Sequence, residues 1–389
     1  MVSYEERKNI ETMQEVLSRQ LSGYARSMRE LSQGLYSTYR PAGQDRLLDL
    51  EQYKEWESRQ MFGTNMDEIS RLIFRLAKSI GDYIPMSLNR KKKITHALKA
   101  EGISLRGAFY LPAAEGRQAL ALTLSTTKKN GIRGEYVAEF LSVLLDQRLC
   151  LSMDSPYRVE CKEQVFIFTD KPRYTVLTGF ARVCRDDEKI SGDNYSFWQN
   201  DCGKLSLLLS DGTGSGEKAC EESGYVVDYM ERMIGAGFDS REALSFVNMA
   251  VCMSSNQLNH PTLDLCTLDL YEGVGEFLKV GGVDSFVKSK DLLLSVAGGN
   301  LPLGIYERPE CAKERVSVKD GEYVIMMTDG VLEALGRQEG SDGVQKHLMA
   351  IQSVNPTEIA SLILRRAIFA SEGHIQDDMT VLVAGMFEM

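Results

Sequence analysis

The stretch KLSLLLSDGTGSGEK, residues 204–218, decides the fold of the C-terminal half of this chain. The apolar run from Leu205 to Leu209 predicts a buried strand, which Asp211-Gly212 ends. Helical spacing follows over Glu217–Ile234, so a strand, a glycine turn and a helix succeed one another. A carboxylate at the end of a buried strand is costly unless turn hydrogen bonds or a cation compensate it.

Three further segments place an acidic residue beside a strand. They are SGDNYS with Asp193, IMMTDGVLE with Asp329, and HIQDDMTVLV with Asp377 and Asp378. An ordinary turn is a sufficient explanation for any one of them. Four together favour a shared site for hard divalent cations, which prefer carboxylate and carbonyl oxygens. The segments are far apart in the sequence, so such a site requires a fold that gathers them.

Other phosphate and hydrolase chemistries lack their motifs. The glycines at 212, 214 and 216 fit neither a P-loop, because no Lys-Ser/Thr pair follows, nor the pattern G-x-G-x-x-G. No cysteine is preceded by histidine, as a cysteine phosphatase requires, and no G-x-S-x-G elbow is present. The four histidines form no zinc cluster, and His374 is expected to be a surface residue.

The composition predicts a soluble, globular protein. A net charge of −10 argues against a nucleic-acid partner, which would need a basic face, and suits a protein that collects cations. The eight cysteines form no CxxC pair, which predicts buried free thiols in a reducing, cytoplasmic compartment. No run approaches the roughly 20 apolar residues of a membrane span, and the charged N-terminus is not a signal peptide.

The front of the chain is expected to be helical. Residues 1–42 are predicted to form one long helix with a heptad seam, which indicates a coiled coil and a dimerisation segment. The seam consists of Ile10, Leu17, Tyr24 and Leu31, together with Leu21, Met28 and Leu35. The alternative is a helix packed on its own domain. Two more helices are predicted over 45–60 and 65–100, the second capped by Asn65 or Asp67 and interrupted by Pro85.

Two domains are expected behind this helix. Residues 43–164 form a small α/β regulatory domain, because ISLRGAFYL, ALALTLST and VFIFTD are typical of strands and a helix is predicted near 134–149. Residues 165–389 consist of strand runs with embedded helices at 217–234, 240–253 and 357–371. This pattern predicts an α+β layered sandwich.

Six segments in this last stretch resemble one known family. SGDNYS, SDGTGSGEKA, TLDLCTLDL, NLPLGI, MMTDGVLE and DDMTVLV occur in the order found in PPM (PP2C-type) metal-dependent phosphatases, and most resemble their sporulation branch. The resemblance covers about residues 165–389, and residues before it resemble that branch's regulatory region only loosely. It implies a PP2C-like β-sandwich flanked by helices, with two Mn²⁺ or Mg²⁺ ions at one end.

The resemblance also implies residue roles. The implied catalytic residues are Asp211, as bridging ligand, and Asp193. The implied metal ligands are Asp193, Asp211, Gly212 through its carbonyl, Asp329, and Asp377 with Asp378 as the alternative. The segment 176–193 departs from larger family members, because it shows neither a motif for their phosphate-binding arginine nor their histidine acid. Arg182 and Arg185 lie nearby without an assigned role.

The implied activity is that of a protein serine/threonine phosphatase. In the sporulation branch the substrate is a phosphorylated anti-anti-sigma factor, whose dephosphorylation activates a sporulation sigma factor. A general stress-response phosphatase of the same type and a catalytically silent scaffold with the same fold are the alternatives. We further expect a homodimer or higher oligomer, no nucleic-acid partner, and membrane attachment only through a region absent from this chain.

Overall fold

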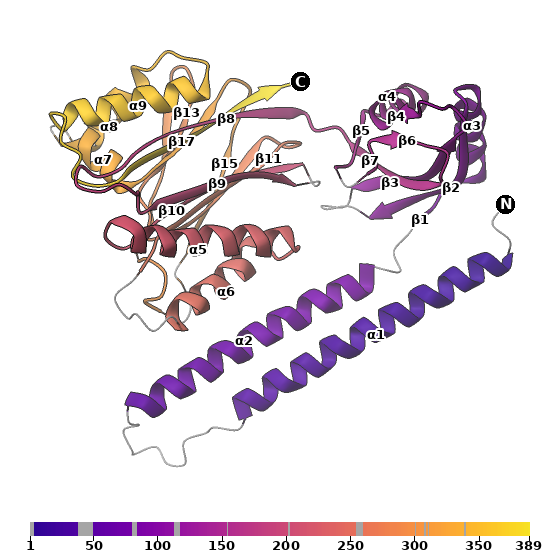
Figure 1. Cartoon of the computed structure of the whole chain (residues 1–389), viewed down its shortest axis with the longest axis horizontal. Coiled ribbons are helices and arrows are strands. Elements are labelled where there is room, and N and C mark those ends of the chain that lie inside the picture. Colours follow the sequence, from indigo (N-terminus) through magenta and orange to yellow (C-terminus); the bar gives the residue numbers. More distant parts are fainter. Residues whose placement is uncertain are drawn as a thin grey trace. The chain divides into compact units, whose positions relative to one another are not determined.

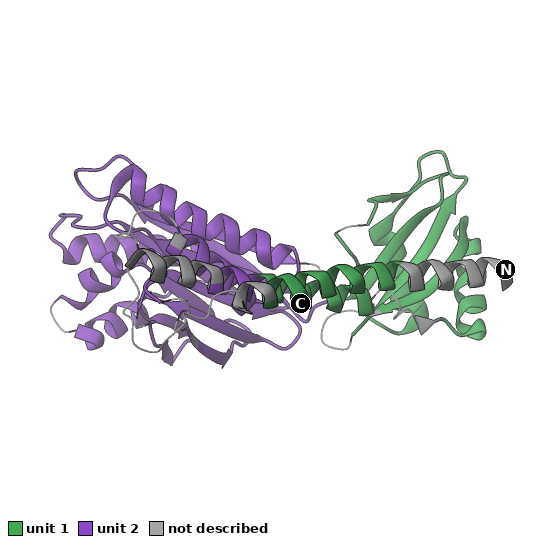
Figure 2. Ribbon diagram, turned by 90° about the horizontal axis from the view of Figure 1, so that it is seen from below, with its two compact units in different colours: residues 1–34, 66–171 green, residues 35–65, 172–389 purple. Residues whose placement is uncertain are grey.

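The computed structural model describes residues 4–37, 50–79, 84–112, 117–153, 155–200, 203–253, 260–299, 301–306, 309, 311–337 and 340–389. Residues 1–34 and 66–171 form one compact unit, and residues 35–65 and 172–389 form the other (Figure 2). In the described ranges, no helix is long and apolar enough to span a bilayer.

The predicted break in the second helical region is wrong. One helix, α2 (Leu50–Ser79), runs through both suggested caps, Asn65 and Asp67. Asn65 is buried in the interior of this helix, and the Asp67 carboxylate pairs with Arg71 one turn later at 2.5 Å, so neither side chain begins a new helix. Pro85 lies in the short strand β1 (Ile84–Pro85), ahead of helix α3 (Leu88–Ala100).

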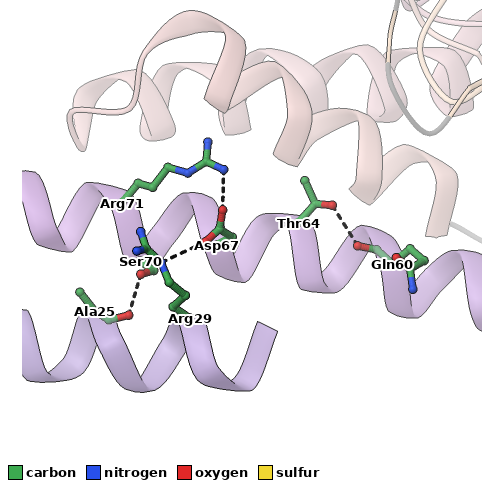
Figure 3. A network of polar contacts seen from close by, with 7 residues as sticks. All are labelled: Ala25, Arg29, Gln60, Thr64, Asp67, Ser70 and Arg71. Atoms are coloured by element: carbon green, nitrogen blue, oxygen red, sulfur yellow. Dashed lines mark hydrogen bonds and ion pairs between the residues drawn. The ribbon is translucent and has the colours of Figure 1, made fainter. Parts of the chain in front are cut away.

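In the first unit, α1 (Tyr4–Ser37) contacts the second half of α2 through a face of small residues. Ala25 is buried, and its carbonyl accepts a hydrogen bond of 2.6 Å from the Ser70 hydroxyl (Figure 3). Three residues of the predicted heptad seam, Leu17, Tyr24 and Leu31, are 44%, 63% and 61% exposed, whereas Leu21 and Met28 are partly buried. The side chains of Ile10 and Leu35 lie outside the described residues, and the dimerising role of the seam stays a prediction.

The rest of the first unit is a sheet with two helices. The strand order is β1-β2-β3-β7-β5, formed with β2 (Ile103–Pro112), β3 (Gln118–Thr126), β5 (Leu149–Leu151) and β7 (Gln164–Asp170). A separate pair joins β4 (Ile132–Arg133) to β6 (Arg158–Val159). Helix α3 and helix α4 (Gly134–Leu145) pack on a core that includes Leu98, Leu122, Leu141 and Phe166. The predicted strands and the predicted helix near 134–149 are confirmed.

The second unit is a sandwich of two antiparallel sheets (Figure 1). The first has the order β15-β12-β11-β10-β9, with bounds Ala312–Ser317, Val274–Val280, Leu263–Asp269, Lys204–Asp211 and Asp193–Asn200. The second has the order β14-β13-β16-β17-β8, with bounds Leu293–Val296, Ser285–Lys288, Tyr323–Met327, Met379–Glu388 and Tyr174–Val183.

Successive side chains along a strand point to opposite faces of the sheet, and this alternation explains the layers of the sandwich. On β10, Leu207 joins the core between the sheets, whereas its neighbour Leu208 faces the helices α5 (Gly216–Gly235) and α6 (Ser240–Met253). The outer face of the second sheet is covered by α7 (Asp329–Gly336), α8 (Gly340–Met349) and α9 (Pro356–Ala370). Helices thus flank both sheets (Figure 1), which confirms the predicted α+β sandwich.

Candidate active site

The register of the first sheet places two predicted site residues side by side. Asp211, the last residue of β10, is paired directly with Asp193, the first residue of β9. Directly opposed residues in an antiparallel pair carry their side chains on one face, with Cβ atoms roughly 5 Å apart. The strand end is held by Thr262, whose hydroxyl accepts a hydrogen bond of 3.0 Å from the Asp211 N–H.

The second sheet reaches the same place through two threonines. Thr380 on β17 and Thr328 after β16 donate their hydroxyl hydrogens to Oδ2 of the fully buried Asp193, at 2.6 and 3.2 Å. Because Asp329 follows Thr328 directly, the strand ends of both sheets meet here. Sequence reasoning missed these threonines, although each stands at a strand end within three residues of a singled-out aspartate.

The adjacent aspartates before β17 differ in their surroundings. Asp378 is 2% exposed, and its two carboxylate oxygens accept hydrogen bonds from the Arg185 and Gly192 N–H groups, at 2.9 and 2.6 Å. Asp377 is exposed, and only its Oδ1 accepts a bond, from the Asp378 N–H at 2.9 Å. This arrangement favours Asp377 over Asp378 as a cation ligand and gives Asp378 a structural role.

Both Asp-Gly motifs need glycine for close backbone contact. A Cβ on Gly212 would lie 2.1 Å from the carbonyl oxygen of Ala219 in α5. A Cβ on Gly330 would lie 2.5 Å from the carbonyl oxygen of Asp378. The first motif is therefore packed against α5 and the second against the Asp377-Asp378 segment that precedes β17.

The arginines singled out near β8 support backbone rather than an open site. The Arg182 guanidinium donates a hydrogen bond of 3.1 Å to the carbonyl oxygen of Asp193 and lies 6.0 Å from the Tyr195 ring centre. Arg185 contributes its backbone N–H to Asp378. His374 is exposed, as expected, with Nδ1 3.9 Å from an Asp186 oxygen.

The four candidate carboxyls resist ionisation. Burial, followed by the charges of Asp378 and Asp329, raises the pKa of Asp193 to about 7, against the opposing effect of the threonine hydrogen bonds. Burial and then the charges of Asp193, Asp329 and Asp377 raise the pKa of Asp211 to about 9. Burial is also the main cause that raises the pKa of Asp329, and partial burial of the otherwise exposed carboxyl is the main cause that raises the pKa of Asp377. A group of carboxyls that hinder one another's ionisation is stabilised by a cation.

The donor set fits a hard divalent cation. Among the described residues, the buried Oδ1 of Asp193 has no hydrogen-bond partner, so a cation would satisfy it. Asp211 and Asp329 line a small pocket together with Thr262, Asp264, Gly282 and Thr328. In the ranges described, however, no three acidic, histidine or cysteine side chains already converge on one point at ligand distance. The aspartates are neighbours, and cation binding would require their side chains to turn inward.

The cysteines do not add a second centre. In the described residues only Cys266 is buried, Cys161 is exposed, and the remaining free thiols are partly exposed. The prediction that most cysteines are buried is therefore wrong. Cys184 and Cys311 lie just outside β8 and β15, and Cys252 is the second-last residue of α6, so these thiols lie at the ends of their elements, where burial is incomplete.

Comparison with known proteins gives one family. The family model for stage II sporulation protein E (SpoIIE) matches residues 201–387. The chain is 27% identical over 333 residues to stage II sporulation protein E of Bacillus subtilis (strain 168), and covers 40% of that protein with 85% of its own length. It is also 27% identical over 329 residues to the Priestia megaterium protein, covering 56% of it with 84% of its own length.

One solved structure extends this similarity over both units. It contains the PP2C phosphatase domain and a regulatory-domain fragment of SpoIIE from Bacillus subtilis. The TM-score is 0.61 at 26% sequence identity, and the match covers 88% of this chain and 99% of the solved one. The resemblance to PP2C-type phosphatases and to their sporulation branch is thereby confirmed.

Proposed function

We propose, since residues 201–387 match the family model for stage II sporulation protein E, that the second unit of this chain is a metal-dependent protein serine/threonine phosphatase. The observation that supports this most strongly is the meeting of strand ends at Asp193. Asp211 stands opposite it on the neighbouring strand, and two threonines of the other sheet hold its Oδ2. Its Oδ1 remains buried and unpaired, as expected of a cation ligand.

The proposed ligands are the carboxylates of Asp193, Asp211, Asp329 and Asp377 and the carbonyl of Gly212, for two Mn²⁺ or Mg²⁺ ions. Such a pair of cations would lower the pKa of a shared water from about 15.7 toward neutrality and offset charge on the phosphoryl oxygens. The chain's own contribution would be to present the carboxylates of Asp211 and Asp193 to the cations, while the threonine hydroxyls keep Asp193 oriented.

The identity of the phosphoprotein substrate is a more specific proposal than the phosphatase activity. The chain spans 40% and 56% of the lengths of the curated relatives, so their whole activity does not transfer with the match. We propose a phosphoserine anti-anti-sigma factor as substrate and activation of a sporulation sigma factor as the consequence. A general stress-response phosphatase and a catalytically silent scaffold remain the competing functions.

Regulation is proposed to act through α5. Because the backbone of Ala219 lies against Gly212, a shift of α5 would move the Asp211-Gly212 turn and alter its geometry for a cation.

The exposed residues Leu17, Tyr24 and Leu31 of the predicted seam support assembly into a dimer through α1. Sedimentation of the full chain and of a Leu17→Lys/Leu31→Lys variant tests the dimer, which the variant should lose.

Hydrolysis of p-nitrophenyl phosphate is the first test of the activity. The account predicts turnover that depends on added Mn²⁺ and disappears with EDTA. Inactivity with every divalent cation would favour the scaffold. Incubation with a phosphorylated anti-anti-sigma factor and, separately, with phosphorylated casein then tests the substrate, for which faster release of phosphate from the anti-anti-sigma factor is expected.

A further inference from the structure

A buried ion pair lies in the same end of the sandwich and has no part in the proposed ligand set. Nζ of Lys279 on β12 is 2.9 Å from Oδ2 of Asp264 on β11, and the side chains are 1% and 4% exposed. The same ammonium donates a hydrogen bond of 2.8 Å to the Ser285 hydroxyl on the other sheet. The pair therefore links the two sheets across the core.

The second oxygen of Asp264 has no such partner. Oδ1 is buried without a hydrogen bond, although a buried carboxylate ordinarily uses both oxygens. Asp264 also lines the pocket that Asp211 and Asp329 line. Gly282 makes room for the carboxylate, because a Cβ there would lie 2.3 Å from both of its oxygens.

Packing alone does not account for this arrangement. A buried ion pair is often no more stabilising than apolar side chains of the same volume, because both charges lose their hydration. Burial also raises the pKa of Asp264, while Lys279 lowers it by supplying the opposite charge. The lysine thus holds in place a carboxyl group whose second oxygen lies at the pocket without a hydrogen-bond partner among the described residues.

The register sets the distance between Asp264 and the candidate ligands. Asp264 is paired with Leu209, two residues before Asp211 on β10, so its side chain is on the same face and one repeat deeper. Asp264 is therefore a diagonal neighbour of Asp211, and such neighbours lie roughly 7–8 Å apart. That separation suits a contact through one water molecule.

We infer that Asp264 is a positioning residue for the divalent-cation centre, whose free Oδ1 accepts a hydrogen bond from the hydration shell of a cation held by Asp211 and Asp329. Lys279 and Ser285 fix its orientation. This inference rests on the proposed function, because it requires that a cation bind at these aspartates. Partners beyond the direct ligands commonly contribute tenfold to a hundredfold to metal affinity.

The test is calorimetric titration of the metal-free full chain with Mn²⁺. The main variant, Asp264→Leu/Lys279→Met, removes both charges and so leaves no unpaired buried ion. The matched control is Asp284→Asn at the same end of the sheet, because both Asp284 oxygens already accept hydrogen bonds, from the Gly298 N–H and the Ser295 hydroxyl. We expect Mn²⁺ affinity to fall about tenfold to a hundredfold in the double variant and to stay unchanged in the control. Excess Mn²⁺ should then restore its turnover.

The outcomes separate this inference from the proposed function. If the parent chain binds no Mn²⁺, the proposed function fails, and the inference with it. If the parent binds but the folded double variant binds equally well, the ion pair is only structural and the inference is overturned. Should the double variant not fold, Gly282→Ala provides the test: it keeps both charges but displaces the Asp264 carboxylate, and unchanged Mn²⁺ affinity there would also overturn the inference.

Discussion

At the residue scale, neighbouring aspartates with the same side chain have different surroundings. Asp193 is buried and held by two threonines, Asp211 stands opposite it, and Asp378 is saturated by backbone N–H groups. Only hydrogen-bond partners and burial distinguish these carboxylates. The sequence could place them at strand ends, but it could not separate Asp377 from Asp378, because that difference depends on which distant backbone amides face them.

Asp211→Asn should abolish phosphatase activity and leave the fold intact. The amide keeps the size of the side chain but removes the charge that would hold a cation. We expect this change to cost several kcal/mol in transition-state stabilisation, which lowers the rate at least about a hundredfold. Rates with p-nitrophenyl phosphate and Mn²⁺ provide the measurement, with Asp228→Asn on the exposed side of α5 as the control. Metal-dependent turnover at the parent rate would remove Asp211 from the centre.

Asp378→Asn and Asp377→Asn should separate stability from cation binding. An amide at 378 can accept only one of the two backbone N–H bonds, so we expect the free energy of unfolding to fall by about 1.5–3 kcal/mol. Asp377→Asn should unfold like the parent and bind Mn²⁺ more weakly. Urea unfolding without metal and Mn²⁺ calorimetry make the comparison, and equal unfolding of both variants would contradict the assigned roles.

The metal-free protein should become less stable as pH rises. The folded-state pKa values of Asp193 and Asp211, about 7 and about 9, lie above the ordinary value of 3.8. The stability associated with the neutral carboxyls is therefore complete below about pH 4 and is lost as pH rises through 7 and 9. Urea unfolding in EDTA between pH 5 and pH 9 measures this loss, which Mn²⁺ should oppose. A loss of the same size in Asp211→Asn would assign it to other groups.

At the element scale, most strands and helices of the second unit could be predicted from the period of their apolar residues. Strand β10 and helix α6 are examples. Helix α2, whose residues are divided between the two units, is an exception, because Asn65 and Asp67 in its interior are residue types that favour a helix start. Tertiary contacts explain the difference: Asn65 is buried, and Asp67 lies 3.4 Å from Arg29 of α1 (Figure 3). Capping preference is a local signal and yields to such contacts.

Gly212→Ala should disturb the contact between β10 and α5. A methyl group there would lie 2.1 Å from the backbone oxygen of Ala219, which cannot move without shifting the helix. We expect a loss of about 1–3 kcal/mol in the free energy of unfolding, together with weaker Mn²⁺ binding. Gly235→Ala, near the end of α5 with open space around it, is the control and should change stability by no more than about 1 kcal/mol. Similar behaviour of the two variants in urea would refute the close contact.

At the scale of the whole molecule, a catalytic sandwich is joined to a second compact unit through a helix whose residues are divided between them. The sequence predicted the sandwich from its strand runs and the family from six ordered segments. It did not predict the Asp264–Lys279 pair, because an acid and a lysine on neighbouring strands reveal their contact only once the register is known.

Removing the front of the chain should change catalysis. If the regulatory proposal holds, residues 165–389 alone will show a lower rate and weaker Mn²⁺ affinity than the full chain, since the signal that positions α5 is missing. Circular dichroism controls for folding of the fragment. A fragment that equals the full chain in both quantities would remove the regulatory role of residues 1–164.

The central claim is that aspartates from both sheets hold divalent cations at one end of the sandwich. Anomalous diffraction from crystals of the full chain grown with Mn²⁺ tests it directly. The account predicts manganese peaks between Asp193, Asp211, Asp329 and Asp377, and their absence in Asp211→Asn. Manganese bound elsewhere, with these four carboxylates unoccupied, would contradict it.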